Sequence, residues 1–179
     1  MVVFFGFLRA ADKGFEDLLD AFAGMRANET TLAVVGGFDE GTSYERALLE
    51  RIDAAGLKDR ICWLGYLGRI EVARWLRAAD AVALPFREGA RPNRSTLVAA
   101  LVNGAAVVTT RGAATPDYLV DGETALLVPP SRPDELAAAI ERLLEDSSLR
   151  ARLREGATAL SPRLSWPRVV QQLLAGDRT

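Results

Sequence analysis

Six short apolar runs constrain the fold of this chain more strongly than any other feature of its sequence. Each run is five or six residues long, and the six lie at residues 2–6, 32–37, 60–64, 80–85, 105–110 and 124–129. None of them alternates regularly between polar and apolar positions. That pattern is typical of strands that are buried on both faces of a sheet.

Longer amphipathic segments separate the apolar runs. Helical spacing of their apolar residues predicts helices at residues 14–26, 43–55, 70–79, 95–103, 133–145 and 147–175. The last of these should be broken near Ser161, Pro162 and Pro167, because proline lacks the N–H group that a helix interior needs. We refer to the predicted helical segments from about residue 147 onward as the closing helices.

Doubly buried strands separated by helices predict a parallel sheet with helices on both faces. Right-handed crossovers then give an α/β, doubly wound, Rossmann-like fold of about six strands. A length of 179 residues without repeats or a linker suits a single domain over residues 1–179. Ligands of such sheets bind beyond the carboxyl ends of the strands, so the loops there are the candidate site.

Composition excludes several kinds of chemistry. The chain has no histidine and one cysteine, Cys62, which rules out histidine triads and argues against a zinc site. The single cysteine, expected on a buried strand, suits a reducing cytoplasm. A net charge of −2 and the lack of a long apolar run predict neither a nucleic-acid partner nor a membrane span. The opening residues lack the features of a signal peptide.

The loop after the first apolar run carries two cations. Arg9 and Lys13 lie between Gly6 and Gly14, where a helix should begin. Glycines allow a ligand to approach the backbone, and a helix N-terminus attracts anions, so this loop suits a phosphate or diphosphate. It matches neither a P-loop nor the dinucleotide fingerprint. A solvated loop with helix caps is the alternative.

Two further loops are less specific. Gly36 and Gly37 form either a turn that needs positive φ or a place where a ligand meets bare backbone. Tyr66 and Leu67 either pack on a nucleobase or close the edge of the core.

The loop that follows residue 85 is locally positive. Four arginines and one glutamate between Phe86 and Thr115 give this stretch a charge of +3. Ser95 or Thr96 is expected to cap the next helix, and an anion could bind the free amides there with Arg94 beside it. A solvated, capped helix start is again the alternative.

The order of segments resembles a known family. The matching runs are FFGFLRAADKGFEDLLDAF, LAVVGG, RICWLGYLGRIEVARWLRAADAVALPF, LVAALVNGAAVVTT and YLVDGETALLVPPSRPDELAAAIERLLED. Together they resemble the C-terminal half of the retaining GT-B glycosyltransferases of the glycosyl transferases group 1 family. The most specific pieces are DGETALLVPP with its following helix and the strand ADAVALP, and Leu164-Ser165-Trp166 is similar to the family's closing F-S-W.

This resemblance implies a domain that binds a nucleoside diphosphate sugar as the donor substrate, with no cofactor and no metal. Lys13, with Arg9, would hold the diphosphate. The base would lie at Tyr66 and Leu67. Glu88-Gly89 resembles the start of the family's E-x7-E motif, and Glu88 would orient the sugar hydroxyls. The resemblance implies these binding residues: Gly6, Lys13, Gly37, Tyr66, Leu67, Gly89, Arg94, Ser95 and Thr96.

The sequence departs from the family in the E-x7-E motif. Counting back from Gly104 places the second glutamate at Ala99 and the first at Arg91, and no acidic residue lies between Glu88 and Asp117. The carboxylate that normally holds the donor ribose is therefore missing. The run EGARPNRSTLVAAL resembles a family variant in which arginines and a serine or threonine contact the diphosphate.

The resemblance also implies a partner. The family has an acceptor-binding domain before the donor domain, and Val2 leads directly into the first donor-domain strand. We expect that domain to be absent and the chain to be an excised fragment or a stand-alone module. The apolar face of the closing helices would then be free for self-association. That face comprises Leu164, Trp166, Val169, Val170, Leu173 and Leu174.

Two functions follow from these observations. The first is part of an enzyme that transfers a hexose with retention, using Lys13, Arg9 and Glu88. The second is a non-catalytic nucleotide-binding or regulatory module, for which Ala99 would be the signature. A response regulator of similar fold would need acidic residues where Arg9 and Lys13 stand.

Overall fold

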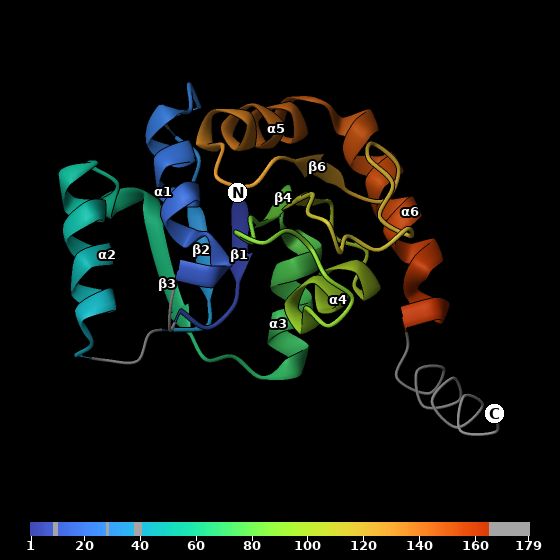
Figure 1. Cartoon of the computed structure of the whole chain (residues 1–179), viewed down its shortest axis with the longest axis horizontal. Helices are drawn as coiled ribbons and strands as arrows, with labels where there is room; N and C mark the ends of the chain where they lie inside the picture. Colours follow the sequence, from blue (N-terminus) through green and yellow to red (C-terminus); the bar gives the residue numbers. More distant parts are fainter. Residues whose placement is uncertain (9–10, 28, 38–40, 165–179) are drawn as a thin grey trace.

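A computed structural model describes residues 1–8, 11–27, 29–37 and 41–164 of the chain. Its centre is one six-stranded sheet in which every neighbouring pair of strands is parallel (Figure 1). The strands are β1 (Val2–Phe5), β2 (Leu32–Val35), β3 (Ile61–Gly65), β4 (Ala81–Leu84), β5 (Val107–Thr110) and β6 (Leu126–Val128). All six predicted strands are thus confirmed.

The strand order is β3-β2-β1-β4-β5-β6. The chain therefore builds the sheet outward from β1 in one direction, and then returns to β4 and builds in the other. This reversal makes the fold doubly wound, and it places the switch point between β1 and β4. The predicted fold class is confirmed.

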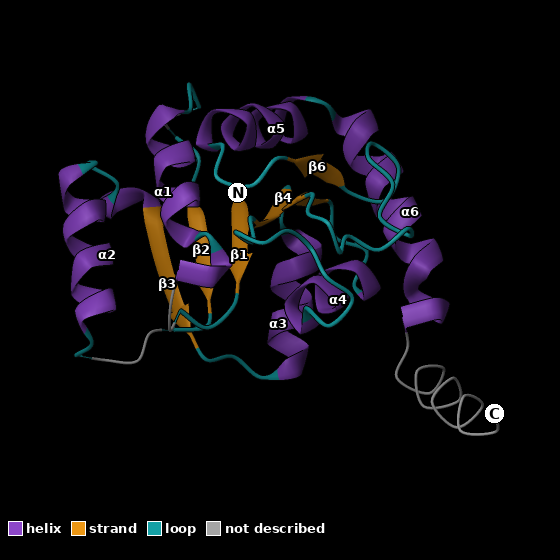
Figure 2. Cartoon of the chain, viewed as in Figure 1, coloured by secondary structure: helices purple, strands orange, loops and turns teal. Residues whose placement is uncertain are grey.

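Helices cover both faces of the sheet (Figure 2). The α-helices are α1 (Phe15–Gly24), α2 (Ser43–Ala54), α3 (Arg69–Ala78), α4 (Ser95–Val102), α5 (Pro133–Glu145) and α6 (Ser147–Leu164), with short 3-10 turns η1 (Ala11–Lys13) and η2 (Lys58–Arg60). Buried residues of α1, α2 and α5 share one apolar cluster. Those of α3 and α4 share the other.

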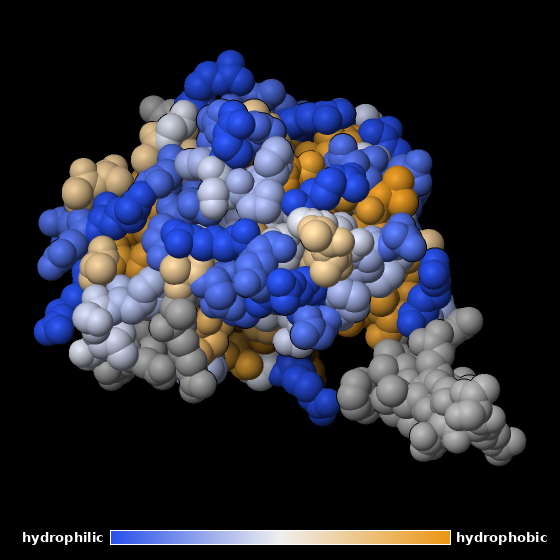
Figure 3. Space-filling view, viewed as in Figure 1, coloured by the Kyte–Doolittle hydropathy of each residue, from blue (hydrophilic) through white to orange (hydrophobic). Residues whose placement is uncertain are grey.

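Alternate residues of the inner strands β2, β1, β4 and β5 supply these two clusters. Along β1, Val2 and Phe4 belong to the first cluster and Val3 to the second. Both sides of the strand are buried, which explains why the apolar runs lack polar alternation. Figure 3 shows that the viewed face is largely hydrophilic, with apolar residues gathered around β6 and beside α6.

Two expectations about the fold are wrong. Cys62 is exposed rather than buried, because β3 is one of the two edge strands of the sheet and the helices do not cover it fully. The last helix is not broken at Ser161 or Pro162, since α6 continues through Pro162 to Leu164. Pro162 thus lies inside α6, where its ring removes one N–H donor without ending the helix.

Residues 165–179 lie outside the described part of the chain, so Pro167 and most of the predicted self-association face do too. Among the described helices, none combines the length and the apolar character that crossing a lipid bilayer requires.

Candidate functional site

The loops that follow β1 and β4 lie side by side at the carboxyl end of the sheet. The backbone N–H of Arg87 donates a hydrogen bond to the carbonyl oxygen of Asp12 at 3.2 Å. Gly14, which caps α1, meets the carbonyl of Pro85 so closely that a Cβ there would be 1.9 Å from its oxygen. These contacts bring together side chains that are far apart in the sequence.

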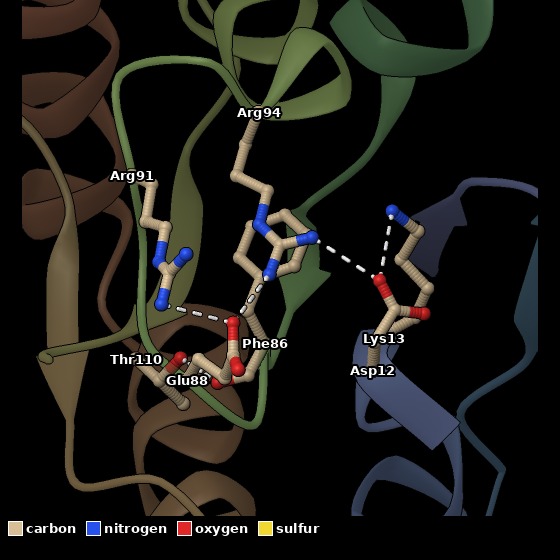
Figure 4. A network of polar contacts seen from close by, with 7 residues as sticks. All are labelled: Asp12, Lys13, Phe86, Glu88, Arg91, Arg94 and Thr110. Carbon is tan, nitrogen blue, oxygen red and sulfur yellow. Dashed lines mark hydrogen bonds and ion pairs between the residues drawn. The ribbon is translucent and has the colours of Figure 1, made fainter. Parts of the chain in front are cut away.

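Five charged side chains form a network across the two loops (Figure 4). Arg94 Nη1 donates to Asp12 Oδ2 at 3.1 Å, and Lys13 Nζ is 3.5 Å from the same oxygen. Glu88 Oε2 is 3.0 Å from Arg91 Nη2 and 3.8 Å from Arg94 Nη2. Cations and carboxylates therefore alternate, and we call Lys13, Arg94 and Arg91 the cation row.

The buried ring of Phe86 supports two members of the cation row. The Arg94 guanidinium carbon lies 4.7 Å from the ring centroid and Lys13 Nζ lies 5.8 Å from it. Both distances suit cation–π attraction. The side chains of Arg94 and Lys13 are only 15% and 23% exposed. These two charges are partly desolvated, which strengthens their attraction for an anion.

The Nε atoms of Arg91 and Arg94 are buried and have no hydrogen-bond partner within the described residues. Arginine carries five N–H groups in a planar fork. Both arginines of the cation row thus have hydrogen-bonding capacity beyond the two carboxylates.

The N-terminus of α4 stands beside Arg94. The cap position is Arg94 itself, with no side-chain cap, so the expectation that Ser95 or Thr96 caps this helix is wrong. The helix starts at Ser95, one residue earlier than a Ser95 cap would allow and two earlier than a Thr96 cap would. The first amides of α4 have no partner inside the helix, and they lie next to an arginine.

Contacts to β5 hold the loop between Phe86 and Arg94 in place. Thr110 Oγ1 donates to the Phe86 carbonyl at 2.5 Å, and the Ala90 N–H donates to the Thr110 carbonyl at 2.8 Å. Gly89 has φ +83°, and a Cβ there would be 2.3 Å from the backbone nitrogen of Gly112. Only glycine fits this position, so Glu88 and Arg91 are presented on a constrained turn.

The positive loop is not a single patch. Arg91 and Arg94 join the network, whereas Arg87 Nη2 lies 3.7 Å from Glu16 Oε2 of α1. Arg111 is exposed. Glu16 therefore draws one of the four arginines away from the cation row.

Arg87 faces a separate polar cavity of about 280 Å³, lined by Glu16, Asp17, Tyr44, Ala47, Leu48, Arg51 and Arg87. Burial raises the pKa of the Asp17 carboxyl above its ordinary value, and Arg87 opposes that rise. Burial also raises the pKa of the Tyr44 hydroxyl.

A larger apolar cavity of about 520 Å³ lies beyond the ends of β1 and β2, between α3 and α4. Its lining is Phe5, Gly6, Phe7, Val35, Gly36, Tyr66, Leu67, Arg69, Val72, Thr96, Ala99, Val102 and Asn103. We call it the apolar cavity. The lining contains three polar or charged side chains, Arg69, Thr96 and Asn103, and no carboxylate from the described residues.

Tyr66 and Leu67 contribute to the apolar cavity in different ways. Tyr66 is 75% exposed, and its ring lies 5.6 Å from that of Phe7. Leu67 is half-buried and packs against the core. Leu67 therefore closes the core edge, whereas the ring of Tyr66 is largely exposed and its contact with a nucleobase stays a prediction.

The candidate residues gather in two adjoining groups. Gly6, Tyr66, Leu67 and Thr96 line the apolar cavity. Gly37 lies beside the Tyr66 ring, and its carbonyl accepts the Leu8 N–H at 2.8 Å. Lys13, Glu88 and Arg94 belong to the charged network. Gly89 and Ser95 lie in the same loop as Glu88 and Arg94 or at its end. Arg9 lies outside the described residues.

Sequence reasoning missed Asp12 and Phe86 as members of this site. Asp12 is next to Lys13 in the sequence, so a carboxylate beside a predicted anion-binding lysine was the available signal. Phe86 follows directly on an apolar run and resembles core. The described residues contain no group of three carboxylate or cysteine side chains placed to hold a metal ion.

Comparisons with known proteins relate the whole chain to one family. The family model described as Glycosyl transferases group 1 matches residues 1–146. The alpha-D-kanosaminyltransferase of Streptomyces kanamyceticus is 30% identical, over 84% of this chain and 38% of that protein. The crystal structure of HepE from Anabaena in complex with UDP is 26% identical and superposes with a TM-score of 0.84, over 98% of this chain and 48% of that one.

A second solved structure shows the same correspondence. Sucrose-phosphate synthase from Thermosynechococcus elongatus is 25% identical with a TM-score of 0.86, and the match covers 99% of this chain and 44% of that one. The chain thus spans less than half the length of each of these relatives.

Proposed function

Because the chain belongs to the glycosyl transferases group 1 family, we propose that it binds a nucleoside diphosphate sugar as the donor substrate of a retaining glycosyltransferase. The observation that carries this proposal is the junction of two surfaces. The cation row suits a diphosphate, and the apolar cavity beside it suits a nucleoside. Thr96, in the first turn of α4, lines the cavity and is two residues after Arg94 of the row.

The apolar cavity is large enough for a nucleoside and has the right lining for one. Ligand pockets are mostly apolar with a few placed polar groups, and the three polar side chains here fit that description. The exposed ring of Tyr66 offers a stacking surface for a base. That HepE of Anabaena has been crystallised with UDP-glucose, at 26% identity and a TM-score of 0.83, supports a sugar nucleotide as the ligand.

The cation row would serve the chemical step. Breaking the bond between sugar and diphosphate builds negative charge on the departing phosphate oxygens. Lys13 and Arg94, fixed over Phe86, would stabilise that charge with little rearrangement. Arg9 would join them. Cations of the protein would thus do what a divalent metal does in other phosphate sites.

Glu88 has a different role in this proposal. Its side chain is 60% exposed and keeps its carboxylate near Arg91 and Arg94. It would accept hydrogen bonds from sugar hydroxyls and so orient the sugar beside the diphosphate. The acceptor would be bound by an acceptor-binding domain that forms the other wall of the site, as the coverage of the relatives suggests.

The proposal is tested by calorimetric titration of the chain with UDP, GDP and ADP, and then with the matching sugar nucleotide. We expect one of the three diphosphates to bind more tightly than the others, and more tightly than its own monophosphate, because a diphosphate brings more negative charge to the cation row. If none binds, even at millimolar concentration and in the full-length protein that carries this chain, the proposal is wrong.

The composition of the apolar cavity favours a second candidate, a binding module without catalysis. Ala99 lies in its wall, at the position where the family has its ribose carboxylate. Transfer or hydrolysis of the sugar nucleotide by the full-length protein separates the two candidates. Binding without turnover of the donor would identify the module.

Ala99→Glu should strengthen nucleotide binding by restoring that carboxylate. A hydrogen bond to a charged group contributes about 1.5–3 kcal/mol, so we expect a gain of about tenfold for the ribonucleoside diphosphate. The 2′,3′-dideoxy analogue should show no such gain. Calorimetry with both nucleotides measures this, and Ala99→Gln is the uncharged control. An equal change for both nucleotides would contradict a ribose contact at this wall.

A further inference from the structure

We propose that Asp12 is a built-in competitor for the diphosphate. Its carboxylate occupies Lys13 and Arg94 while the site is empty, and the entering diphosphate displaces it. This inference rests on the proposed function, because it assigns an anionic ligand to the same two cations. Asp12 would then help to set the affinity for the diphosphate without contacting the sugar or the base.

The position of one oxygen atom carries the inference. Asp12 Oδ2 lies 3.1 Å from Arg94 Nη1 and 3.5 Å from Lys13 Nζ (Figure 4). A single anionic oxygen that bridges an arginine and a lysine does what a phosphoryl oxygen would do at the same place. The carboxylate and a phosphate therefore compete for the same donors.

The Asp12 carboxylate can move away from the site more easily than Lys13 or Arg94 can. The Asp12 side chain is 47% exposed, compared with 15% for Arg94 and 23% for Lys13. The two cations rest against Phe86. The backbone of Asp12 is held by the Arg87 N–H, so displacement needs only rotation of a short side chain toward water.

Glu88 competes less directly for the same cations. Its oxygen is 3.8 Å from Arg94, beyond the 3.1 Å of Asp12, and its shorter contact of 3.0 Å is to Arg91. Asp12 is thus the carboxylate that the diphosphate must displace from both Lys13 and Arg94.

Removing the Asp12 charge should tighten anion binding. The network has three cations and two carboxylates, so Asp12→Asn doubles its net positive charge from +1 to +2. The asparagine keeps an oxygen that can accept from Arg94, which preserves the position of the guanidinium. We expect a gain in affinity of about threefold to tenfold at low ionic strength, and a smaller gain at 0.5 M salt, where charges are screened.

The experiment titrates inorganic pyrophosphate, and separately the nucleoside diphosphate that binds best, into the wild-type chain, Asp12→Asn and Asp12→Ser. Asp53→Asn is the matched control, because Asp53 is an exposed aspartate of α2 whose pairing with Lys58 lies outside the site. It changes the net charge of the chain by the same amount. Thermal unfolding checks that each variant is folded.

Tighter pyrophosphate binding by Asp12→Asn or Asp12→Ser, with Asp53→Asn unchanged, is the expected result. Equal or weaker binding by both folded Asp12 variants, or no pyrophosphate binding by any of these proteins, would overturn the inference. The nucleotide titration reports separately on the proposed function. If pyrophosphate binds more tightly to Asp12→Asn while no nucleotide binds to the chain or to the full-length protein that carries it, Asp12 competes for an anion but the sugar-nucleotide proposal fails.

Discussion

Arg94→Ala lowers the affinity of the chain for its nucleoside diphosphate by about 100-fold in our expectation. Charge-assisted hydrogen bonds contribute about 1.5–3 kcal/mol each, and a loss of about 2.7 kcal/mol corresponds to a factor of 100 in the dissociation constant. Arg94 is the most buried cation of the row, with 15% of its side chain exposed. Its truncation also removes the contact with Phe86 and frees Asp12 to repel the ligand.

Two companion variants separate position from charge. Arg94→Lys keeps the charge but loses the planar fork that grips a phosphate, so its affinity should fall between those of the wild type and Arg94→Ala. Arg111→Ala removes an exposed arginine of a neighbouring loop and should bind nearly as the wild type does. Calorimetric titration measures all three. If Arg94→Ala bound as tightly as Arg111→Ala, Arg94 would have no part in the site.

Lys13→Ala should weaken binding as well, by about tenfold to 30-fold, on the same reasoning. The double variant should lose less than the product of the two single losses. Lys13 and Arg94 share both Asp12 and Phe86, and residues with shared partners are not additive.

The fold was readable from the sequence because its strands are buried on both sides. Residues 80–85, for example, predict a strand, and Ala81–Leu84 form β4 in the middle of the sheet. Residues 60–64 have the same apolar character, yet β3 is the edge strand and leaves Cys62 exposed. The local pattern of apolar residues predicts that a segment is a strand. It does not predict the place of that strand in the sheet, which depends on the order in which the strands pair.

The candidate site was readable in part for a similar reason. Lys13 and Arg94 each stand in a loop at a helix start, which a sequence shows directly. The hydrogen bond between Arg94 and Asp12 joins residues that are 82 positions apart in the sequence. They meet only because β1 and β4 are neighbours in the sheet. Arg87 and Arg94 are both arginines of the same loop. Arg87 lies apart from the cation row because it pairs with Glu16 of α1.

Gly14→Ala should destabilise the chain by more than about 3 kcal/mol. Gly14 has φ +64° as the cap of α1, a left-handed conformation that costs other residues about 1–2 kcal/mol. Its Cβ would also lie 1.9 Å from the Pro85 oxygen. Backbone must move to relieve that contact, and no flexible side chain can absorb it. Large losses of stability have this kind of local cause.

Denaturant unfolding of Gly14→Ala beside Gly24→Ala tests this expectation. Gly24 ends the same helix, and a Cβ there would meet nothing within 4 Å, so alanine should be neutral or stabilise by about 0.5–1 kcal/mol. An unchanged midpoint for Gly14→Ala would contradict the close approach of the two loops.

The same contact links stability to binding. Gly14 follows Lys13, and Pro85 precedes Phe86, so the distance between these two backbones sets how Lys13 and Arg94 share one ring and one carboxylate. Any Gly14→Ala protein that remains folded should therefore bind the diphosphate more weakly, although no ligand-contacting side chain has changed. The close contact between the β1 and β4 loops thus keeps Lys13 and Arg94 near enough to form one anion site from two distant parts of the chain.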